Sequence, residues 1–344
     1  MRYKLLGRSG LRVSELCLGT MTFGEEWGWG SSAEESRRVF DAFGEAGGNF
    51  LDTANRYTEG TSEKLVGDMI RAERDHWVLA TKYTLTMDRR DPNFSGNHRK
   101  NMMQSVEASL KRLGTDFIDL YWLHAWDFTT GVDEVMRAFD DLVRQGKVLH
   151  IGVSDAPAWI VSQANTLADL RGWTPFCALQ VEYSLIERTV ERELLPMARA
   201  FGLAVTPWSP LGSGLLTGKY KSLDDWKKED ARLSEGSHRL TERNLAIARA
   251  VTETAEAVGA SPAQVAIAWV LAQPGTMIPI LGARTLKQLQ DNLGCLDVEL
   301  PEDALARLDE VSAIEPGFPH DFLRREPIRE IVYSAKADRI DGLP

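Results

Sequence analysis

Short apolar runs alternate with longer amphipathic stretches along most of this chain. An apolar run of about four to eight residues is typical of a buried strand, and apolar residues spaced three and four apart are typical of a helix that packs on one side. After a hairpin over residues 3–6 and 11–13, the pattern predicts eight buried strands. They span residues 15–19, 50–53, 77–82, 117–124, 148–154, 178–181, 203–207 and 277–280.

A predicted helix follows each of these strands. Ser31 and Ser32 stand before two glutamates and mark one helix start, and Pro157 occupies a first-turn position, where its missing N–H is not needed. The helices are expected at residues 31–46, 61–71, 99–113, 132–145, 157–170, 191–201, 241–258 and 286–293, with an additional one at 262–272.

The fold class follows from this order. Eight strand–helix units in 344 residues, with no change of composition and no flexible linker, predict a single-domain (β/α)8 barrel of the TIM-barrel class over residues 1–344. Residues 1–14 are expected to form a hairpin cap. Residues 315–344 are expected to add C-terminal helices and loops as a tail near the barrel mouth, either folded over the mouth or lying on the surface.

Charge and composition restrict the partners. The net charge of −10 disfavours nucleic acid or an anionic membrane as the main partner. No run approaches the roughly 18 apolar residues of a membrane span, and the first residues lack a signal-peptide core. Cys17, Cys177 and Cys295 lie far apart among apolar residues, as expected of reduced thiols in a cytoplasmic protein. The six histidines have no metal-ligand spacing, so no metal is expected.

Groups able to hold or move a proton follow three consecutive predicted strands. Asp52 with Tyr57 nearby, then Lys82, then His124 each come at the end of an apolar run. In barrels of this class, the carboxyl ends of the strands carry the chemistry. Each residue taken singly has an ordinary structural explanation, but the four together on adjacent strands indicate an acid–base site.

The four groups suit proton transfer to or from an oxygen that is being reduced or formed. A phenol has a pKa near 10, and a neighbouring ammonium favours the phenolate, so Lys82 is expected to lower the pKa of Tyr57. Asp52 would keep Lys82 charged, and His124 would orient or polarise a substrate oxygen. No serine or cysteine nucleophile is paired with a base, which disfavours acyl transfer.

Eight short motifs follow one another at the predicted strand ends. They are Leu18-Gly-Thr-Met-Thr-Phe-Gly24, Phe50-Leu-Asp-Thr-Ala-Asn-Arg-Tyr57, Ala80-Thr-Lys82, Asp119-Leu-Tyr-Trp-Leu-His124, Gly152-Val-Ser154, Gln180-Val-Glu-Tyr-Ser184, Trp208-Ser-Pro-Leu-Gly-Ser-Gly-Leu-Leu-Thr-Gly-Lys-Tyr220 and Gly282-Ala-Arg-Thr285. Together, over about residues 2–315, they resemble the aldo-keto reductase family. The most similar branch is the one shared by bacterial reductases and potassium-channel β-subunits.

The resemblance implies a catalytic tetrad of Asp52, Tyr57, Lys82 and His124, with Tyr57 as general acid/base. It also implies hydride transfer to or from a nicotinamide that lies extended across the barrel mouth, in a reaction between a carbonyl and an alcohol. On the family's pattern the cofactor would be held by Thr20, Met21, Asp52, Ser154, Asp155, Gln180, Trp208, Ser209, Pro210, Leu211, Gly214, Leu215, Lys219, Arg232, Gly282, Arg284, Gln288 and Asn292.

The surroundings of Arg284 favour NADP(H) over NAD(H). Its guanidinium is a planar donor fork, and Thr285 lies at a predicted helix start, whose N–H groups favour anions such as a 2′-phosphate. The glycine-rich run 212–218 lacks the spacing of a dinucleotide fingerprint, but beside Lys219 it suits a phosphate cradle.

Aromatic residues on the predicted mouth loops suggest a wall for a small-molecule carbonyl or alcohol substrate. They are Trp27, Trp29, Phe94, Trp126 and Phe128, beside the catalytic Tyr57 and His124. Long loops after the third, fourth and seventh strands favour a substrate larger than a simple aldehyde. The sequence does not identify this substrate, and it leaves a homo-oligomer open.

Two positions depart from the family's pattern. The family usually has Ser-Asn at the end of the fifth strand, whereas this chain has Ser154-Asp155. An ionised Asp only accepts hydrogen bonds and attracts a cation, so our hypothesis is that Asp155 favours the oxidised nicotinamide and biases the reaction towards alcohol oxidation. Arg56 replaces a residue that is usually small, next to Tyr57.

Two other functions fit parts of the pattern. A nicotinamide-sensing accessory subunit, similar to the channel β-subunits, would keep the tetrad and turn over very slowly. A Schiff-base aldolase would use Lys82 as nucleophile, but Asp52 should keep that amine protonated and poorly nucleophilic.

Overall fold

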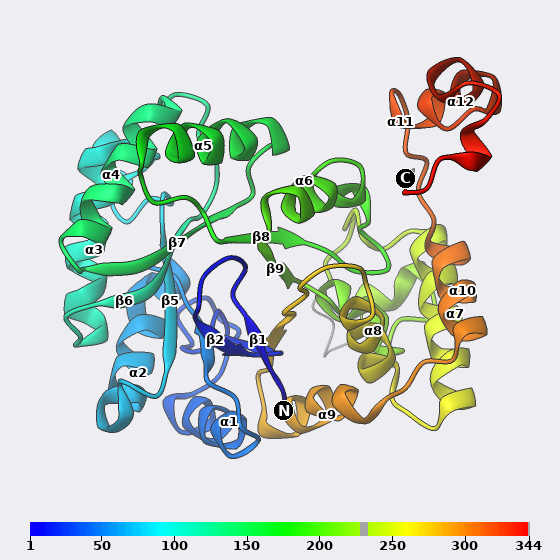
Figure 1. Ribbon diagram of the computed structural model, residues 1–344. Coiled ribbons are helices and arrows are strands. Elements are labelled where there is room, and N and C mark those ends of the chain that lie inside the picture. The colour runs from blue at the N-terminus through cyan, green and yellow to red at the C-terminus, as the bar shows by residue number, and fades with distance from the viewer. Residues whose placement is uncertain (228–232, 343–344) are drawn as a thin grey trace.

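The computed structural model of the protein describes residues 1–227 and 233–342. Eight parallel strands form one sheet in the order β10-β3-β4-β5-β6-β7-β8-β9, and a bridge between Val205 and Met277 brings its two ends together. Helices surround this sheet (Figure 1), so the predicted (β/α)8 barrel is confirmed. The strands are β3 (Cys17–Gly19), β4 (Phe50–Asp52), β5 (Val78–Tyr83), β6 (Ile118–Leu123), β7 (Val148–Ser154), β8 (Ala178–Glu182), β9 (Ala204–Trp208) and β10 (Ile280–Gly282).

The predicted helices are present with small shifts at their ends. α6 begins later than residue 191 because a separate 3-10 turn precedes it. α10 was not predicted, whereas α11 and α12 lie in the tail where C-terminal helices were expected. The helices are α1 (Ala33–Glu45), α2 (Thr61–Ile70), α3 (Arg99–Leu113), α4 (Val132–Arg144), α5 (Ala158–Arg171), α6 (Leu194–Phe201), α7 (Glu242–Val258), α8 (Pro262–Leu271), α9 (Leu286–Leu293), α10 (Glu302–Ser312), α11 (His320–Leu323) and α12 (Glu326–Tyr333).

The eighth strand differs most from its prediction, which placed it at residues 277–280. The ladder with β3 begins only at Ile280, opposite Cys17, whereas Ile278 N donates to the Val205 carbonyl oxygen at 2.9 Å. Pro279, between them, has no N–H to donate, but its carbonyl oxygen accepts from Cys17 N at 3.0 Å on the β3 side. The segment therefore joins β9 with its first residues and β3 with its last ones.

The interior of the barrel is packed around the indole of Trp122. This side chain is completely buried with Phe50, Leu120 and Ile278. Gly152 is its register partner on β7, and a Cβ at that glycine would collide with the indole ring. One large residue beside a glycine thus fills the interior at the density that protein cores require.

A hairpin of β1 (Tyr3–Leu5) and β2 (Arg12–Ser14) lies across the amino end of the barrel, as predicted (Figure 1). Lys4 Nζ donates to the Met277 carbonyl oxygen at 2.7 Å, and Leu6 is completely buried. This end of the barrel is therefore covered, and open space is concentrated at the opposite end.

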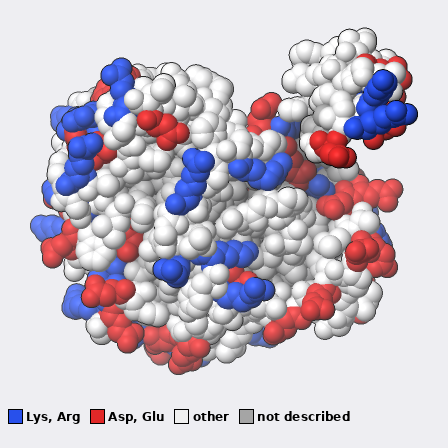
Figure 2. Space-filling model, in the orientation of Figure 1, with Lys and Arg blue, Asp and Glu red and all other residues white. Residues whose placement is uncertain are grey.

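The described part of the C-terminal tail lies on the surface, which is one of the two placements that the sequence left open. Described residues 315–342 contribute nothing to the cavity at the barrel mouth, and neither α11 nor α12 has a buried residue. The tail contacts the barrel near α6, where His320 Nε2 lies 2.9 Å from Glu193 Oε1. It forms a separate lobe beyond α6 and α10, with its own basic and acidic side chains (Figures 1 and 2).

None of the described helices is long and apolar enough to cross a membrane. The three cysteines are buried and unpaired, and burial raises the pKa of the Cys177 and Cys295 thiols to about 12.

Gly7→Ala tests how tightly the hairpin is seated. Gly7 has φ of 59°, and a Cβ there would lie far inside contact distance of the Cys177 carbonyl oxygen. The substitution should lower the free energy of unfolding in urea by about 2 kcal/mol or more, because strain and overpacking add. Gly10→Ala on the same hairpin meets nothing within 4 Å and should change stability by less than about 0.5 kcal/mol. Equal losses of stability in the two variants would show that the close approach of Gly7 to the Cys177 carbonyl oxygen is unimportant.

Candidate active site

The site is built around the ammonium group of Lys82, which is completely buried near the carboxyl end of β5. Lys82 Nζ donates to Asp52 Oδ2 at 2.5 Å, to the Thr53 carbonyl oxygen at 3.0 Å and to Tyr57 Oη at 2.9 Å. These bonds use all three of its donors. A Schiff-base nucleophile must be unprotonated and free to attack, so this arrangement disfavours the aldolase alternative.

Asp52 connects this group to the opposite side of the barrel. It ends β4, and its second oxygen, Oδ1, accepts from Gln180 Nε2 on β8 at 3.0 Å. Both oxygens of a buried carboxylate are thereby satisfied, as burial of a charge requires. The parallel pairing of β4 with β5 brings Asp52 and Lys82 together at the same end of the sheet.

His124 stands next to Tyr57. It follows β6 directly, and its ring centroid lies 6.1 Å from that of Tyr57 in an edge-on arrangement of 84°. Its backbone N–H donates to Thr84 Oγ1 at 3.2 Å, whereas Nδ1 is buried without a partner among the described residues. The structure thus brings all four predicted catalytic residues together.

Burial and charge set the protonation states. Burial alone would lower the pKa of Lys82, but Asp52 and Tyr57 more than compensate and raise it, so the ammonium stays charged. Burial, with a smaller effect of Lys82, lowers the pKa of His124 well below its usual value, so the imidazole is neutral at pH 7.

Burial raises the pKa of Tyr57 overall, although Lys82 acts in the expected direction and lowers it. The Asp52 charge supports the effect of burial, and the opposing effect of Lys82 does not cancel it. A phenol that loses its hydration is harder to ionise. Tyr57 is therefore a protonated donor at neutral pH, held in place by a charged lysine.

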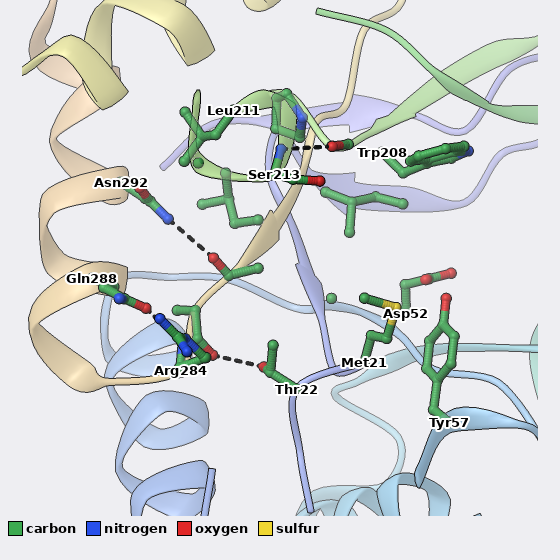
Figure 3. A pocket seen from close by; sticks show the side chains of 18 of the residues that line it. Met21, Thr22, Asp52, Tyr57, Trp208, Leu211, Ser213, Arg284, Gln288 and Asn292 are labelled. Carbon is green, nitrogen blue, oxygen red and sulfur yellow. Dashed lines mark hydrogen bonds between the residues drawn. The ribbon is translucent and has the colours of Figure 1, made fainter. Parts of the chain in front are cut away.

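A cavity of about 880 Å³ opens at this end of the barrel and extends well beyond the tetrad. In Figure 3, Asp52, Tyr57 and Trp208 lie at one end, and Arg284, Gln288 and Asn292 lie at the other. Most of the predicted cofactor residues lie on its wall. They are Met21, Asp52, Ser154, Asp155, Gln180, Trp208, Ser209, Pro210, Leu211, Gly214, Lys219, Gly282, Arg284, Gln288 and Asn292.

Two predicted cofactor residues lie elsewhere. Thr20 is completely buried, and its hydroxyl donates to the Asp52 carbonyl oxygen at 3.1 Å, so it supports β4 from behind the cavity. Leu215 is completely buried in the hydrophobic core. Arg232 lies outside the described residues.

The predicted substrate wall is only partly present. Trp27, Tyr57 and His124 line the cavity, and Trp29 packs on Trp27 from outside with 5.6 Å between the ring centroids. Phe94 and Trp126 do not line it. Phe94 ends the 3-10 turn η3 (Pro92–Phe94), and the side chain of Trp126 packs against the hydrophobic core.

Several cavity residues were missed. Arg239 belongs to the long insertion after β9, yet it lines the cavity and forms an ion pair with Glu182 at the end of β8. No sequence signal connects residues so far apart. Arg56 also lines the cavity and pairs with Glu59, which accepts from Trp27 Nε1 at 3.3 Å. The others are Gly19, Thr22, Leu85, Ser213, Thr217, Ala263, Ile280, Leu281, Ala283 and Asp291.

The middle of the cavity has the features of a phosphate cradle. Gly214, in the 3-10 segment η5 (Gly212–Thr217), has φ of 91°, and a Cβ there would lie 3.4 Å from Lys219 Cε. Ser209 and Ser213 also have positive φ, and Ser213 N donates to Ser209 Oγ at 3.2 Å. The N–H groups of Gly212, Ser213 and Gly214 are bonded within the turn, so a pyrophosphate there would depend on the charge of Lys219, which lines the cavity.

Arg284 lies at the end of the cavity opposite Tyr57 (Figure 3). Its side chain forms no ion pair within the described part of the chain, and its backbone N–H donates to Gln288 Oε1 at 2.8 Å. The start of α9 does not contribute as expected. Thr285 Oγ1 caps Gln288 N, and Glu35 Oε1 accepts from Leu286 N at 2.7 Å, so these helix N–H groups are already bonded. A 2′-phosphate there would depend on Arg284 itself.

Backbone strain is concentrated at the mouth. Eight non-glycine residues within the described ranges have positive φ. Of these, Ser334 lies in the tail, and the other seven lie on loops at the carboxyl end of the barrel: Thr58, Glu59, Thr84, Phe128, Asp155, Ser209 and Ser213. Such conformations cost free energy and cluster at functional sites. Among the described residues, no group of three or more metal-ligating side chains comes together.

Comparisons with known proteins agree with this geometry. The sequence model of the aldo/keto reductase family matches residues 15–313. The chain therefore belongs to the aldo/keto reductase family, and membership makes it an oxidoreductase.

Several proteins similar to this chain are named as reductases or dehydrogenases. The norsolorinic acid reductase stcV of Emericella nidulans is 42% identical over 93% of this chain and 83% of its own length. The putative aryl-alcohol dehydrogenase AAD14 of Saccharomyces cerevisiae is 37% identical, over 95% of this chain and 90% of its own length. An aryl-alcohol dehydrogenase [NADP(+)] of Phanerodontia chrysosporium is 37% identical, over 90% of this chain and 86% of its own length.

Proposed function

We propose that this protein is an NADP(H)-dependent reductase or dehydrogenase that interconverts an aromatic carbonyl and its alcohol, with Tyr57 as general acid/base. The observation that carries the proposal is the chain of hydrogen bonds from Asp52 through Lys82 to the Tyr57 hydroxyl, at the wall of an elongated cavity. The names of the similar aryl-alcohol dehydrogenases support an aromatic substrate.

The residues of the chain supply the proton. In the direction of reduction, Tyr57 donates its proton to the carbonyl oxygen as that oxygen gains negative charge, and Lys82 stabilises the phenolate that remains. Asp52 keeps Lys82 charged throughout. His124, neutral and adjacent, orients the substrate oxygen. In oxidation, the same phenolate takes the proton of the alcohol.

The elongated cavity fits a dinucleotide. Trp208 and Gln180 lie at the tetrad end, Lys219 lies beside the glycine-rich cradle, and Arg284 lies at the far end, where it would take the 2′-phosphate. A nicotinamide bound at the tetrad end supplies or accepts the hydride. Arg284 is charged and its fork is not occupied by a carboxylate of the described chain, which supports NADP(H) as the preferred form.

Tyr57→Phe tests the general acid. Turnover of an aromatic aldehyde such as veratraldehyde, followed at 340 nm, should fall by at least about a thousandfold, while the Kd of NADPH changes less than about threefold. The matched control is Tyr121→Phe on β6, the strand next to the one that carries Lys82. The Tyr121 hydroxyl has no partner among the described residues, so its loss should leave turnover unchanged. Retained turnover in Tyr57→Phe would overturn the assignment.

Arg284→Ala tests the cofactor preference. It should weaken NADPH binding by roughly tenfold or more and NADH binding by less than about twofold, because only NADPH carries the 2′-phosphate. Cofactor fluorescence titrations measure both constants. Lys287→Ala removes an exposed cation three residues further on, in the first turn of α9 and outside the cavity, and should affect neither constant. An equal loss for both cofactors would place the 2′ position elsewhere.

Asp155→Asn tests the bias between oxidised and reduced cofactor. Asp155 Oδ1 accepts from Trp208 Nε1 at 3.2 Å, and an asparagine keeps that acceptor while it removes the charge. The affinity for NADP+ relative to NADPH should fall by roughly three- to tenfold, since the carboxylate attracts the cationic ring. Asp291→Asn removes a charge from the part of the cavity wall formed by α9 and should leave this affinity ratio unchanged. An unchanged ratio in Asp155→Asn would refute the hypothesis.

A further inference from the structure

A second cavity of about 510 Å³ lies beside the first and shares Asp155 and Trp208 with it. Its walls come from the loop after β6, the residues between β7 and α5, the end of β8 with the loop that follows it, the first residue of α6 and the end of β9. Its volume lies within the range of small-molecule sites. The indole of Trp208, which donates to Asp155 Oδ1 at 3.2 Å, borders both cavities.

The lining of this second cavity is apolar with a negative edge. Phe128, Pro157, Val190 and Leu194 are among its apolar residues, with Ala156 and Val181. Its charged residues are all carboxylates: Asp155, Glu182 and Glu187. No lysine, arginine or histidine lines it among the described residues. Arg239 pairs with Glu182, but Asp155 and Glu187 form no ion pair among the described residues and would repel an anion, so the site suits an uncharged apolar group.

Phe128 is held in an unfavourable position at the edge of this cavity. Its side chain is 70% exposed, and its φ of 57° is rare for a bulky residue. The loop is rigid all the same. Asp127 Oδ2 accepts from Asn97 N at 2.7 Å, and Asn97 Oδ1 accepts from Asp127 N at 2.7 Å.

The same carboxylate fixes the other side of the loop. Asp127 Oδ1 accepts from Thr129 N at 2.8 Å and from Thr130 N at 2.9 Å, so the residue before Phe128 is bonded to the two residues after it. The chain thus uses a network of hydrogen bonds to hold a phenyl ring in solvent on a strained backbone. Neither exposure nor strain stabilises the fold, which points to a binding role for the ring.

We infer that the second cavity binds the distal ring of an extended, uncharged aromatic substrate, with Phe128 as its stacking wall. The inference rests on the proposed function for the reacting end of that substrate. The carbonyl lies at Tyr57 in the first cavity, and the remainder passes Asp155 and Trp208, which border both cavities. Aromatic rings prefer offset or edge-on contacts, which an exposed phenyl at a cavity edge provides.

A binding experiment tests the site without turnover. The probe is N-phenyl-1-naphthylamine, an uncharged aromatic amine whose fluorescence rises in apolar surroundings. It should bind the wild-type protein, and Phe128→Ala should weaken it at least fivefold. Phe94→Ala, the same change on a neighbouring loop outside both cavities, should leave its Kd unchanged. Saturating NADPH should not displace it.

Charge selectivity gives a second readout. The anilinonaphthalene sulfonate is the same ring system with one negative charge, and it should bind at least tenfold more weakly. Equal affinity of the neutral probe for the wild type and Phe128→Ala would overturn the inference, as would displacement by NADPH or tighter binding of the sulfonate.

Kinetics connect the site to the substrate. Phe128→Ala should lower kcat/KM for anthracene-9-carbaldehyde at least fivefold more than for benzaldehyde. The additional loss should come from a higher KM for the larger aldehyde, with kcat little changed. An equal effect on both aldehydes would contradict a distal-ring site. If the wild type reduces neither aldehyde, the proposed function fails, and the probe titrations still decide whether the second cavity binds an uncharged ring.

Discussion

The burial of one ammonium group is the constraint on which the rest of the structure depends. Lys82 has no exposed surface, so its charge must be compensated inside the barrel. Asp52, the Thr53 carbonyl and the Tyr57 hydroxyl provide that compensation, and Gln180 in turn holds Asp52. A buried ion pair of this kind adds little stability compared with apolar packing of the same volume. The barrel retains it because it fixes a phenol and an ammonium in one geometry at the opening.

The two ends of the barrel serve opposite purposes. At the amino end the hairpin seats Leu6 and Gly7 against the strands and leaves little space. At the carboxyl end, residues such as Asp155 and Ser209 adopt strained conformations and leave two cavities open. A closed sheet packed around Trp122 is rigid enough to tolerate that strain. Stability and chemistry are therefore separated in space.

The two cavities carry different charges and therefore suit different ligands. The first contains Lys219 and Arg284 along its length and suits a ligand with phosphates. The second has only carboxylates among its charged lining residues and suits an uncharged ring. Asp155 and Trp208 belong to both walls, so one hydrogen-bonded pair borders cofactor and substrate alike. In the proposed function, this arrangement would let a polar dinucleotide and an apolar substrate bind side by side.

The sequence alone determined the barrel and its reactive end. Strand and helix periods differ, and polar groups at the ends of apolar runs necessarily gather at one rim of a parallel sheet. Only the tertiary structure decided the rest. The pKa of Tyr57 depends on burial, which no local pattern reports, and the last strand pairs with two neighbours on either side of Pro279. Arg239 reaches the cavity, and Thr20 does not, because long-range packing places side chains that sequence spacing cannot.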